Sequence, residues 1–76
     1  MTDWKQYIER DPGVMLGKPV FKGTRLTVEF ILERLAQGAT PQDLLENYEG
    51  LKPEYIPAAL AYAASVVSHE ELVASA

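Results

Sequence analysis

The sequence predicts a mainly α-helical fold: three helices in a helix-turn-helix outline, preceded by a short N-terminal β-hairpin. From residue 27 onward, apolar residues recur at helical spacing behind clear helix-start signals. The segment before it consists of short apolar runs separated by glycine- and proline-containing turns. A chain of 76 residues is expected to be a single domain over 1–76, with the hairpin region at 7–23 and the three-helix bundle at 27–68.

The hairpin is predicted from short runs that end in turn signals. Residues 7–10, 14–16 and 20–22 are expected to make two or three short strands. The intervening Asp-Pro-Gly at 11–13 favours a turn, because proline presets φ, glycine accepts a positive φ and aspartate bonds its own backbone. The pattern leaves the strand pairing open.

The first helix is predicted over 28–37. Thr27 is a suitable N-cap and Gly38 a suitable residue just beyond the C-terminus. The residues at i, i+3, i+4 and i+7 are all apolar, which indicates one buried face: Val28, Ile31, Leu32 and Leu35.

The second helix is predicted to start at Thr40 and to stop near residues 49–50. Thr40 would be its N-cap, Pro41 its first residue and Asp43 the acidic group at the third position. The four residues 49–52, which include a glycine, have a length that suits the turn of a helix-turn-helix.

The third helix is expected to open at 51–54 and to run to about Val67 or beyond, with a bend at Pro57. It carries two apolar stripes. The stripe assigned to the intramolecular core is Ile56, Leu60, Ala63 and Val67. The second stripe is Tyr55, Ala59, Tyr62 and Val66, and either this stripe or the strands of the hairpin is expected to form a homodimer interface. A homodimer is expected because so short a chain has a small core and no disulfide to supplement it.

The charge distribution restricts DNA binding to one part of the molecule. The net charge is −4, yet residues 1–40 hold six basic and five acidic side chains. Residues 53–68 contain no arginine, lysine, asparagine or glutamine to read base edges. The candidate DNA contacts are Lys18, Lys22, Arg25, Lys52 and Tyr55. For Lys18, Lys22 and Arg25, the open alternatives are solvated loop charges or contacts to an acidic partner protein. A small three-helix domain without DNA binding is the alternative for the fold.

Several kinds of chemistry are not expected from this composition. The chain has no cysteine and one histidine, His69, so we expect no metal, no cofactor and no enzymatic activity. Asp43, Glu46 and Glu49 share a helix face, which we interpret as solvated rather than metal-binding. The start of the chain lacks a secretory signal pattern, and the apolar run 56–67 is too short to span a bilayer. A cytoplasmic protein without a membrane partner is therefore expected.

Residues 17–28, GKPVFKGTRLTV, resemble the signature GKPxxxGTRxxV of a family of short prokaryotic proteins, domain of unknown function 433. The resemblance extends over about residues 7–66. It implies a homeodomain-like helical domain with an N-terminal β element, typically dimeric. It also implies an antitoxin-like role, in which the protein binds a PIN-like ribonuclease toxin and represses its own promoter by binding operator DNA. A protein-interaction module that has kept the fold without binding DNA is the alternative. Pro57 stands where relatives often carry a charged residue.

Overall fold

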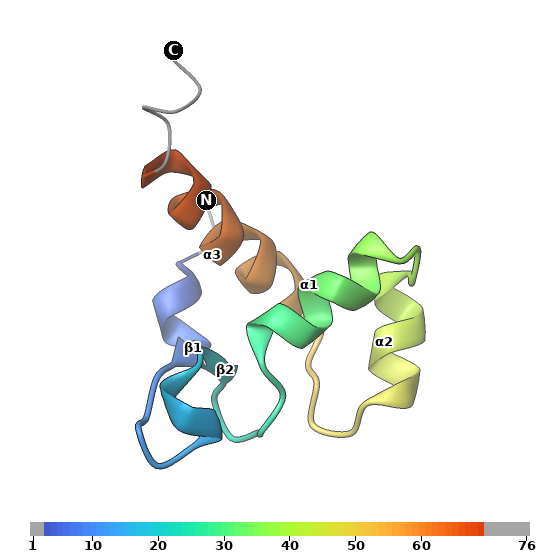
Figure 1. The fold of residues 1–76 in the computed structure, drawn as a ribbon. Coiled ribbons are helices and arrows are strands. Elements are labelled where there is room, and N and C mark those ends of the chain that lie inside the picture. The colour runs from blue at the N-terminus through green and yellow to red at the C-terminus, as the bar shows by residue number, and fades with distance from the viewer. Residues whose placement is uncertain (1–2, 70–76) are drawn as a thin grey trace.

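The computed structural model describes residues 3–69 and is mainly helical, with a small antiparallel sheet near the N-terminus (Figure 1). The predicted fold class is therefore confirmed. The elements in chain order are the 3-10 turn η1 (Trp4–Gln6), β1 (Ile8–Glu9), the 3-10 turn η2 (Met15–Gly17), β2 (Val20–Phe21), α1 (Val28–Ala36), α2 (Pro41–Asn47) and α3 (Tyr55–His69).

The hairpin has two strands and not three. Ile8 lies opposite Phe21, and Glu9 lies opposite Val20. The predicted turn at 11–13 is present, because the Asp11 Oδ1 atom accepts a hydrogen bond from the Gly13 N–H at 2.9 Å. The strand expected at 14–16 is wrong. Met15 and Leu16 have φ angles of 48° and 59°, and this left-handed backbone forms η2 instead of an extended strand.

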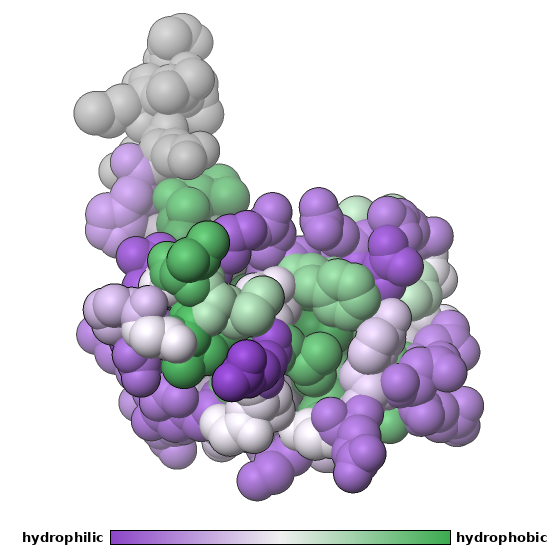
Figure 2. All heavy atoms as spheres, turned by 60° about the horizontal axis from the view of Figure 1, so that its bottom comes forward, coloured by the Kyte–Doolittle hydropathy of each residue, from purple (hydrophilic) through white to green (hydrophobic). Residues whose placement is uncertain are grey.

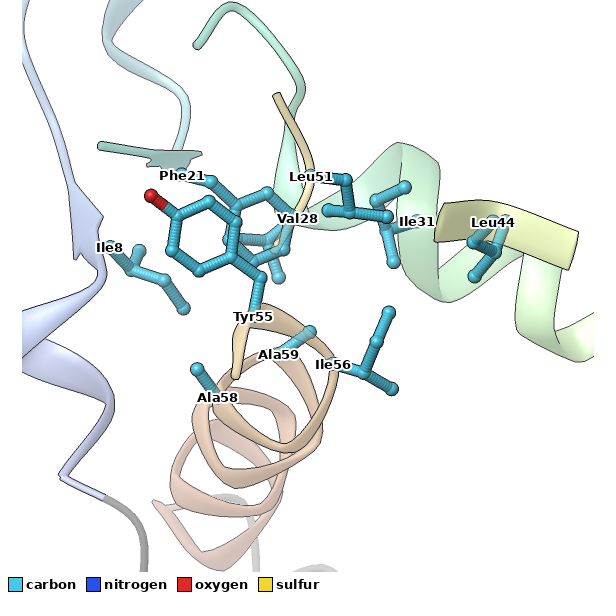
Figure 3. Packing of buried hydrophobic residues seen from close by; sticks show 10 residues of the cluster. All are labelled: Ile8, Phe21, Val28, Ile31, Leu44, Leu51, Tyr55, Ile56, Ala58 and Ala59. Atoms are coloured by element: carbon cyan, nitrogen blue, oxygen red, sulfur yellow. The ribbon is translucent and has the colours of Figure 1, made fainter. Parts of the chain in front are cut away.

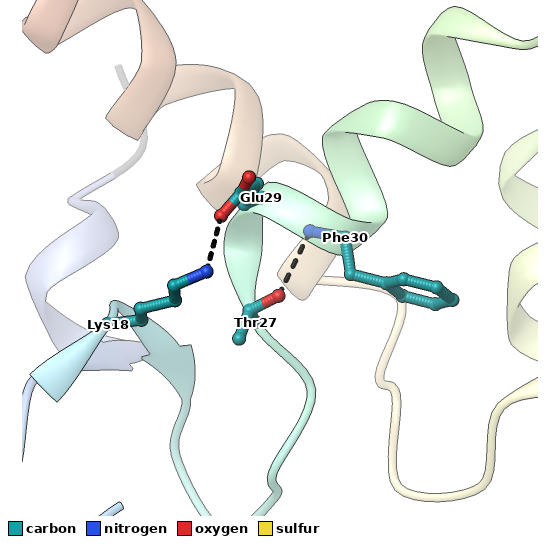
Figure 4. A network of polar contacts seen from close by, with 4 residues as sticks. All are labelled: Lys18, Thr27, Glu29 and Phe30. Carbon is teal, nitrogen blue, oxygen red and sulfur yellow. Dashed lines mark hydrogen bonds and ion pairs between the residues drawn. The ribbon is translucent and has the colours of Figure 1, made fainter. Parts of the chain in front are cut away.

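Helix α1 begins and ends close to the predicted residues. The Thr27 hydroxyl accepts a hydrogen bond from the Phe30 N–H at 3.0 Å, which caps the helix (Figure 4). Lys18, before β2, pairs with Glu29 in the first turn at 3.2 Å. Gly38 has a φ of 100° just beyond the helix, as the C-terminal signal predicted.

Helix α2 begins with a complete capping box. The Thr40 hydroxyl accepts from the Asp43 N–H at 3.1 Å, and the Asp43 carboxylate accepts from the Thr40 N–H at 3.0 Å. The hydrogen bond from the Thr40 N–H, with the Thr40 hydroxyl as a smaller contribution, favours the charged carboxylate and lowers the pKa of Asp43 below its ordinary value of 3.8.

Replacing Asp43 with asparagine is expected to reduce the acid sensitivity of folding. A lowered folded-state pKa stabilises the protein above the ordinary pKa, and that contribution is lost as pH falls through the folded-state value. The urea midpoint of the wild type should therefore exceed that of Asp43→Asn at pH 7, and the two should converge below pH 3.8. An equal gap between the two proteins at both pH values would contradict this account.

Helix α3 begins at Tyr55, later than the predicted opening at 51–54. The link from α2 covers residues 48–54, which is longer than the turn of about three or four residues in a helix-turn-helix. Pro57 consequently lies in the first helical turn, where backbone N–H groups have no intrahelical partner. The hydrogen bond that a proline removes from a helix interior is therefore not lost here.

The core lies where the hairpin, α1, the α2 region and the first half of α3 meet (Figure 3). Phe21 is fully buried and its ring stacks on that of Tyr55, with centroids 4.9 Å apart and planes 10° apart. Ile31 and Leu44 extend the core toward α2. The second half of α3 extends away from this centre (Figure 1).

Candidate functional site

Tyr55 is part of the interior. Its side chain is 4% exposed, and its hydroxyl donates a hydrogen bond to the Lys22 backbone carbonyl at 2.8 Å. Ala59, one turn later, is also fully buried. The assignments of Tyr55 to DNA and of Tyr55 and Ala59 to a dimer interface are therefore wrong, because the hairpin covers this face of α3 within the same chain.

The other two predicted interface residues differ from each other. Tyr62 is half-buried, with its ring edge-to-face against Trp4 at 4.8 Å and its hydroxyl accepting from Arg10 at 3.3 Å. Val66 is exposed. Trp4 thus packs η1 against α3.

The exposed apolar surface of α3 lies on the stripe that was expected to be internal. Leu60 is 53% exposed and Val67 is 64% exposed. They are seven residues apart and lie on one helix face, with Ala63 and Ala64 between them. We call Leu60, Ala63, Ala64 and Val67 the outer α3 stripe. Placing Leu60 and Val67 in the core was wrong, because only the first half of α3 is covered.

The candidate basic residues fall into different surroundings. Lys18 is paired with Glu29, as described above. Lys22 and Lys52 both adjoin Tyr55: the carbonyl of Lys22 accepts its hydroxyl, and the Lys52 ammonium lies 6.0 Å from the centre of its ring. The structure thus brings two of the predicted basic residues to adjacent loops and places Lys18 against α1.

Arg25 is carried by a tightly bonded turn. The Thr24 hydroxyl donates to the Phe21 carbonyl at 2.8 Å and accepts from the Leu26 N–H at 3.0 Å. The Phe21 N–H in turn donates to the Leu26 carbonyl at 3.1 Å. Gly23 has a φ of 80°, which glycine adopts without strain. The backbone of Arg25 is fixed by its neighbours, while its exposed side chain makes no hydrogen bond or ion pair within residues 3–69.

A hollow of about 300 Å³ lies beside this turn, and we call it the Arg25 pocket. It is lined by Met15, Arg25, Leu26, Thr27, Phe30 and Tyr48. The Phe30 ring is held in place by the Tyr48 ring, edge-to-face at 5.3 Å, and by the Arg34 guanidinium, 5.3 Å from the ring centre.

Met15, which lines this pocket, and its neighbour Leu16 have strained backbones. Met15 and Leu16 are not glycines, yet both adopt left-handed backbone angles, which costs roughly 1–2 kcal/mol for each residue. Leu16 is 93% exposed. Figure 2 brings this side of the molecule forward and shows hydrophobic side chains at the surface on both sides of a strongly hydrophilic one.

Two further hollows adjoin each other between α1, α3 and the hairpin. Their volumes are about 360 and 340 Å³, and Pro19 and Tyr62 line both. The second is walled by apolar residues of α1, with Glu29 and Glu33 at its rim.

Other kinds of site have no support in the described part of the chain. Within residues 3–69, no group of three or more histidine, cysteine or acidic side chains could hold a metal ion. The His69 Nδ1 atom lies 2.7 Å from the Ser65 carbonyl and has no acidic or nucleophilic partner in that range. None of the helices in that range is long and apolar enough to cross a membrane.

A family model described as a protein of unknown function, DUF433, matches residues 8–63. The chain belongs to the DUF433 family. It is also similar to the crystal structure of a DUF433 member from Anabaena variabilis ATCC 29413, with 30% sequence identity and a TM-score of 0.74. That match covers 91% of this chain and 68% of the other. No curated protein matches the sequence significantly.

In this DUF433 protein, the motif at 17–28 has a structural role that the sequence alone did not assign. It runs through β2, the bonded turn that carries Arg25, and the N-cap of α1. Charge alone selected Arg25 as a candidate. Phe30, Tyr48 and Met15 were missed because they are distant in sequence, and only Phe30 gave a signal: an aromatic residue outside the buried stripe of its helix.

Proposed function

We propose that this DUF433 protein is an antitoxin-like regulator that binds and silences a PIN-like ribonuclease as a homodimer. The observation that carries the proposal is the outer α3 stripe, an exposed apolar face on a helix that extends away from the core (Figure 1). The resemblance in the motif supplies the class of partner.

The stripe has the features of a helix-pairing surface. Leu60 and Val67 are large and exposed, and the alanines between them allow a second helix to approach closely. Residues 55–68 contain no charged side chain, so no charge would have to be buried when two copies pair. A chain with a core this small also gains stability from such pairing.

Sedimentation equilibrium and co-expression together test this function. The chain is expected to sediment as a dimer at micromolar concentration. Co-expression with the protein encoded by the adjacent gene should suppress that protein's ribonuclease activity and yield a stable complex. A monomer at micromolar concentration, or an adjacent protein that is neither bound nor inhibited, would count against the proposal.

Binding to operator DNA is a second candidate function, supported by the proximity of Lys22 and Lys52 on adjacent loops around Tyr55. These lysines can contact phosphates. Helix α3 cannot read bases in the usual way, because residues 55–69 contain no arginine, lysine, asparagine or glutamine. A protein-interaction module that binds no DNA remains the alternative.

The double substitution Lys22→Ala and Lys52→Ala is expected to weaken any gel shift on the upstream promoter DNA. Each lost phosphate contact should lower the slope of log affinity against log salt by about 1. Lys5→Ala is the matched control, because Lys5 lies over Trp4, whose ring packs on Tyr62 and not on Tyr55. No shift at low salt, or equal weakening by the control, would contradict DNA binding at these loops.

A further inference from the structure

We propose that the Arg25 pocket binds a segment of a partner protein that presents an apolar side chain next to a carboxylate. This inference rests on the proposed partner-binding function and names the site and the chemistry that the partner must supply.

The pocket has the composition of a site for one apolar side chain. Its volume of about 300 Å³ is at the lower end of the range for ligand pockets, and its walls are mostly apolar or aromatic. The contacts of Phe30 with Tyr48 and Arg34 fix one wall. Met15 contributes a flexible part of the wall, because its unbranched thioether side chain adapts to different shapes.

Arg25 supplies the charge selectivity. Its guanidinium has no acidic partner within residues 3–69, and it lines a pocket that is otherwise without charge. A carboxylate can accept two parallel hydrogen bonds from a guanidinium, which lysine cannot offer. The bonded Thr24 turn holds the backbone of Arg25 in place, so less conformational entropy is lost when a ligand binds.

The strained backbone beside the pocket is the independent observation. Met15 and Leu16 keep left-handed angles although neither is glycine, and Leu16 gains no burial within this chain. Strain of this kind tends to occur at ligand-binding segments. Here it accompanies Met15, which lines the pocket, and its exposed neighbour Leu16.

The surroundings favour a peptide over a nucleic acid. A stacked base needs a free aromatic face, whereas the Phe30 ring already contacts Arg34 and Tyr48. Helix α2, which ends just before Tyr48, carries acidic residues and no lysine or arginine. These acidic residues repel the many phosphates of a nucleic-acid backbone. A peptide carboxylate carries a single negative charge and needs only one favourable contact, with Arg25.

The test is a titration of the full-length, isotope-labelled chain with short acetylated peptides, followed by amide NMR shifts. The probes are a peptide with a central Leu-Asp pair and two controls, with Leu-Asn and Ser-Asp in its place. The Leu-Asp peptide is expected to shift the amides of residues 15, 25–30 and 48 in a saturable manner. Each control peptide should bind more weakly, because it lacks either the carboxylate or the apolar side chain.

Two protein variants localise the binding. Arg25→Ala should lower the affinity for the Leu-Asp peptide by about tenfold or more, because a pair of charge-assisted hydrogen bonds is lost. Lys22→Ala, a nearby basic residue outside the pocket, should weaken it by about twofold at most. Circular dichroism of both variants should match that of the wild type.

Three outcomes would overturn the inference: no saturable shift at millimolar peptide, equal loss in both variants, or a mixed-sequence DNA duplex that shifts the pocket amides more strongly than the peptide. The peptide titration reports neither dimerisation nor ribonuclease inhibition. A failure of peptide binding at the pocket can therefore be distinguished from a failure of the proposed function.

Discussion

Replacing Phe21 with alanine is expected to leave most of the protein unfolded at room temperature. Phe21 has 0% exposure, pairs through β2 with Ile8, and stacks on Tyr55 at the centre of the core. Truncation of a fully buried phenylalanine costs about 3–5 kcal/mol. A single core in a chain of this size supplies roughly 3–5 kcal/mol in total, so the loss consumes most of the free energy of unfolding.

Urea denaturation followed by circular dichroism measures this effect. Phe21→Leu should give a smaller loss and a resolvable transition if the alanine variant does not fold. Leu16→Ala is the matched control for apolar truncation, because Leu16 is almost fully exposed, and its free energy of unfolding should differ from that of the wild type by no more than about 0.5 kcal/mol. If Phe21→Ala kept the wild-type midpoint, the core would not be centred on this residue.

The helices could be predicted well because their signals are local. The hydroxyl of Thr27 and the capping box of Thr40 and Asp43 act within three residues, and Gly38 ends α1 through its own φ angle. The run 14–16 failed for the opposite reason. Its residue types favour a strand, but the chain turns there to bring β2 against β1, and Met15 and Leu16 adopt strained angles.

Periodicity alone could not predict which face of α3 is buried and which is exposed. The sequence shows two apolar stripes, but long-range contacts decide which one is covered. The hairpin, through Phe21 and the carbonyl of Lys22, covers Tyr55 and leaves Leu60 exposed. The Arg25 pocket was beyond prediction for the same reason, because its walls come from three separate segments that meet only in the folded chain.

Replacing Leu60 and Val67 together with aspartate is expected to convert the proposed dimer to a monomer. Both side chains are on the outer α3 stripe, with more than half of each exposed in the isolated chain. An uncompensated charge buried at a helix interface costs about 3–5 kcal/mol, which weakens association more than a hundredfold. The fold should be retained, because neither side chain belongs to the core.

Val66→Asp is the control that separates the two stripes of α3. Val66 is also exposed, lies next to Val67 in sequence and receives the same charge, but it points about 100° away around the helix. Sedimentation equilibrium should show a dimer for Val66→Asp and a monomer for the Leu60→Asp, Val67→Asp variant, with matching circular dichroism spectra. The reverse result would place the interface on the face of Tyr62 and Val66, and a dimer in all variants would exclude α3 from the interface. The double variant adds two charges and Val66→Asp adds one, so Val67→Asp alone, which adds one charge at the neighbouring residue, is the comparison that isolates the position on the helix.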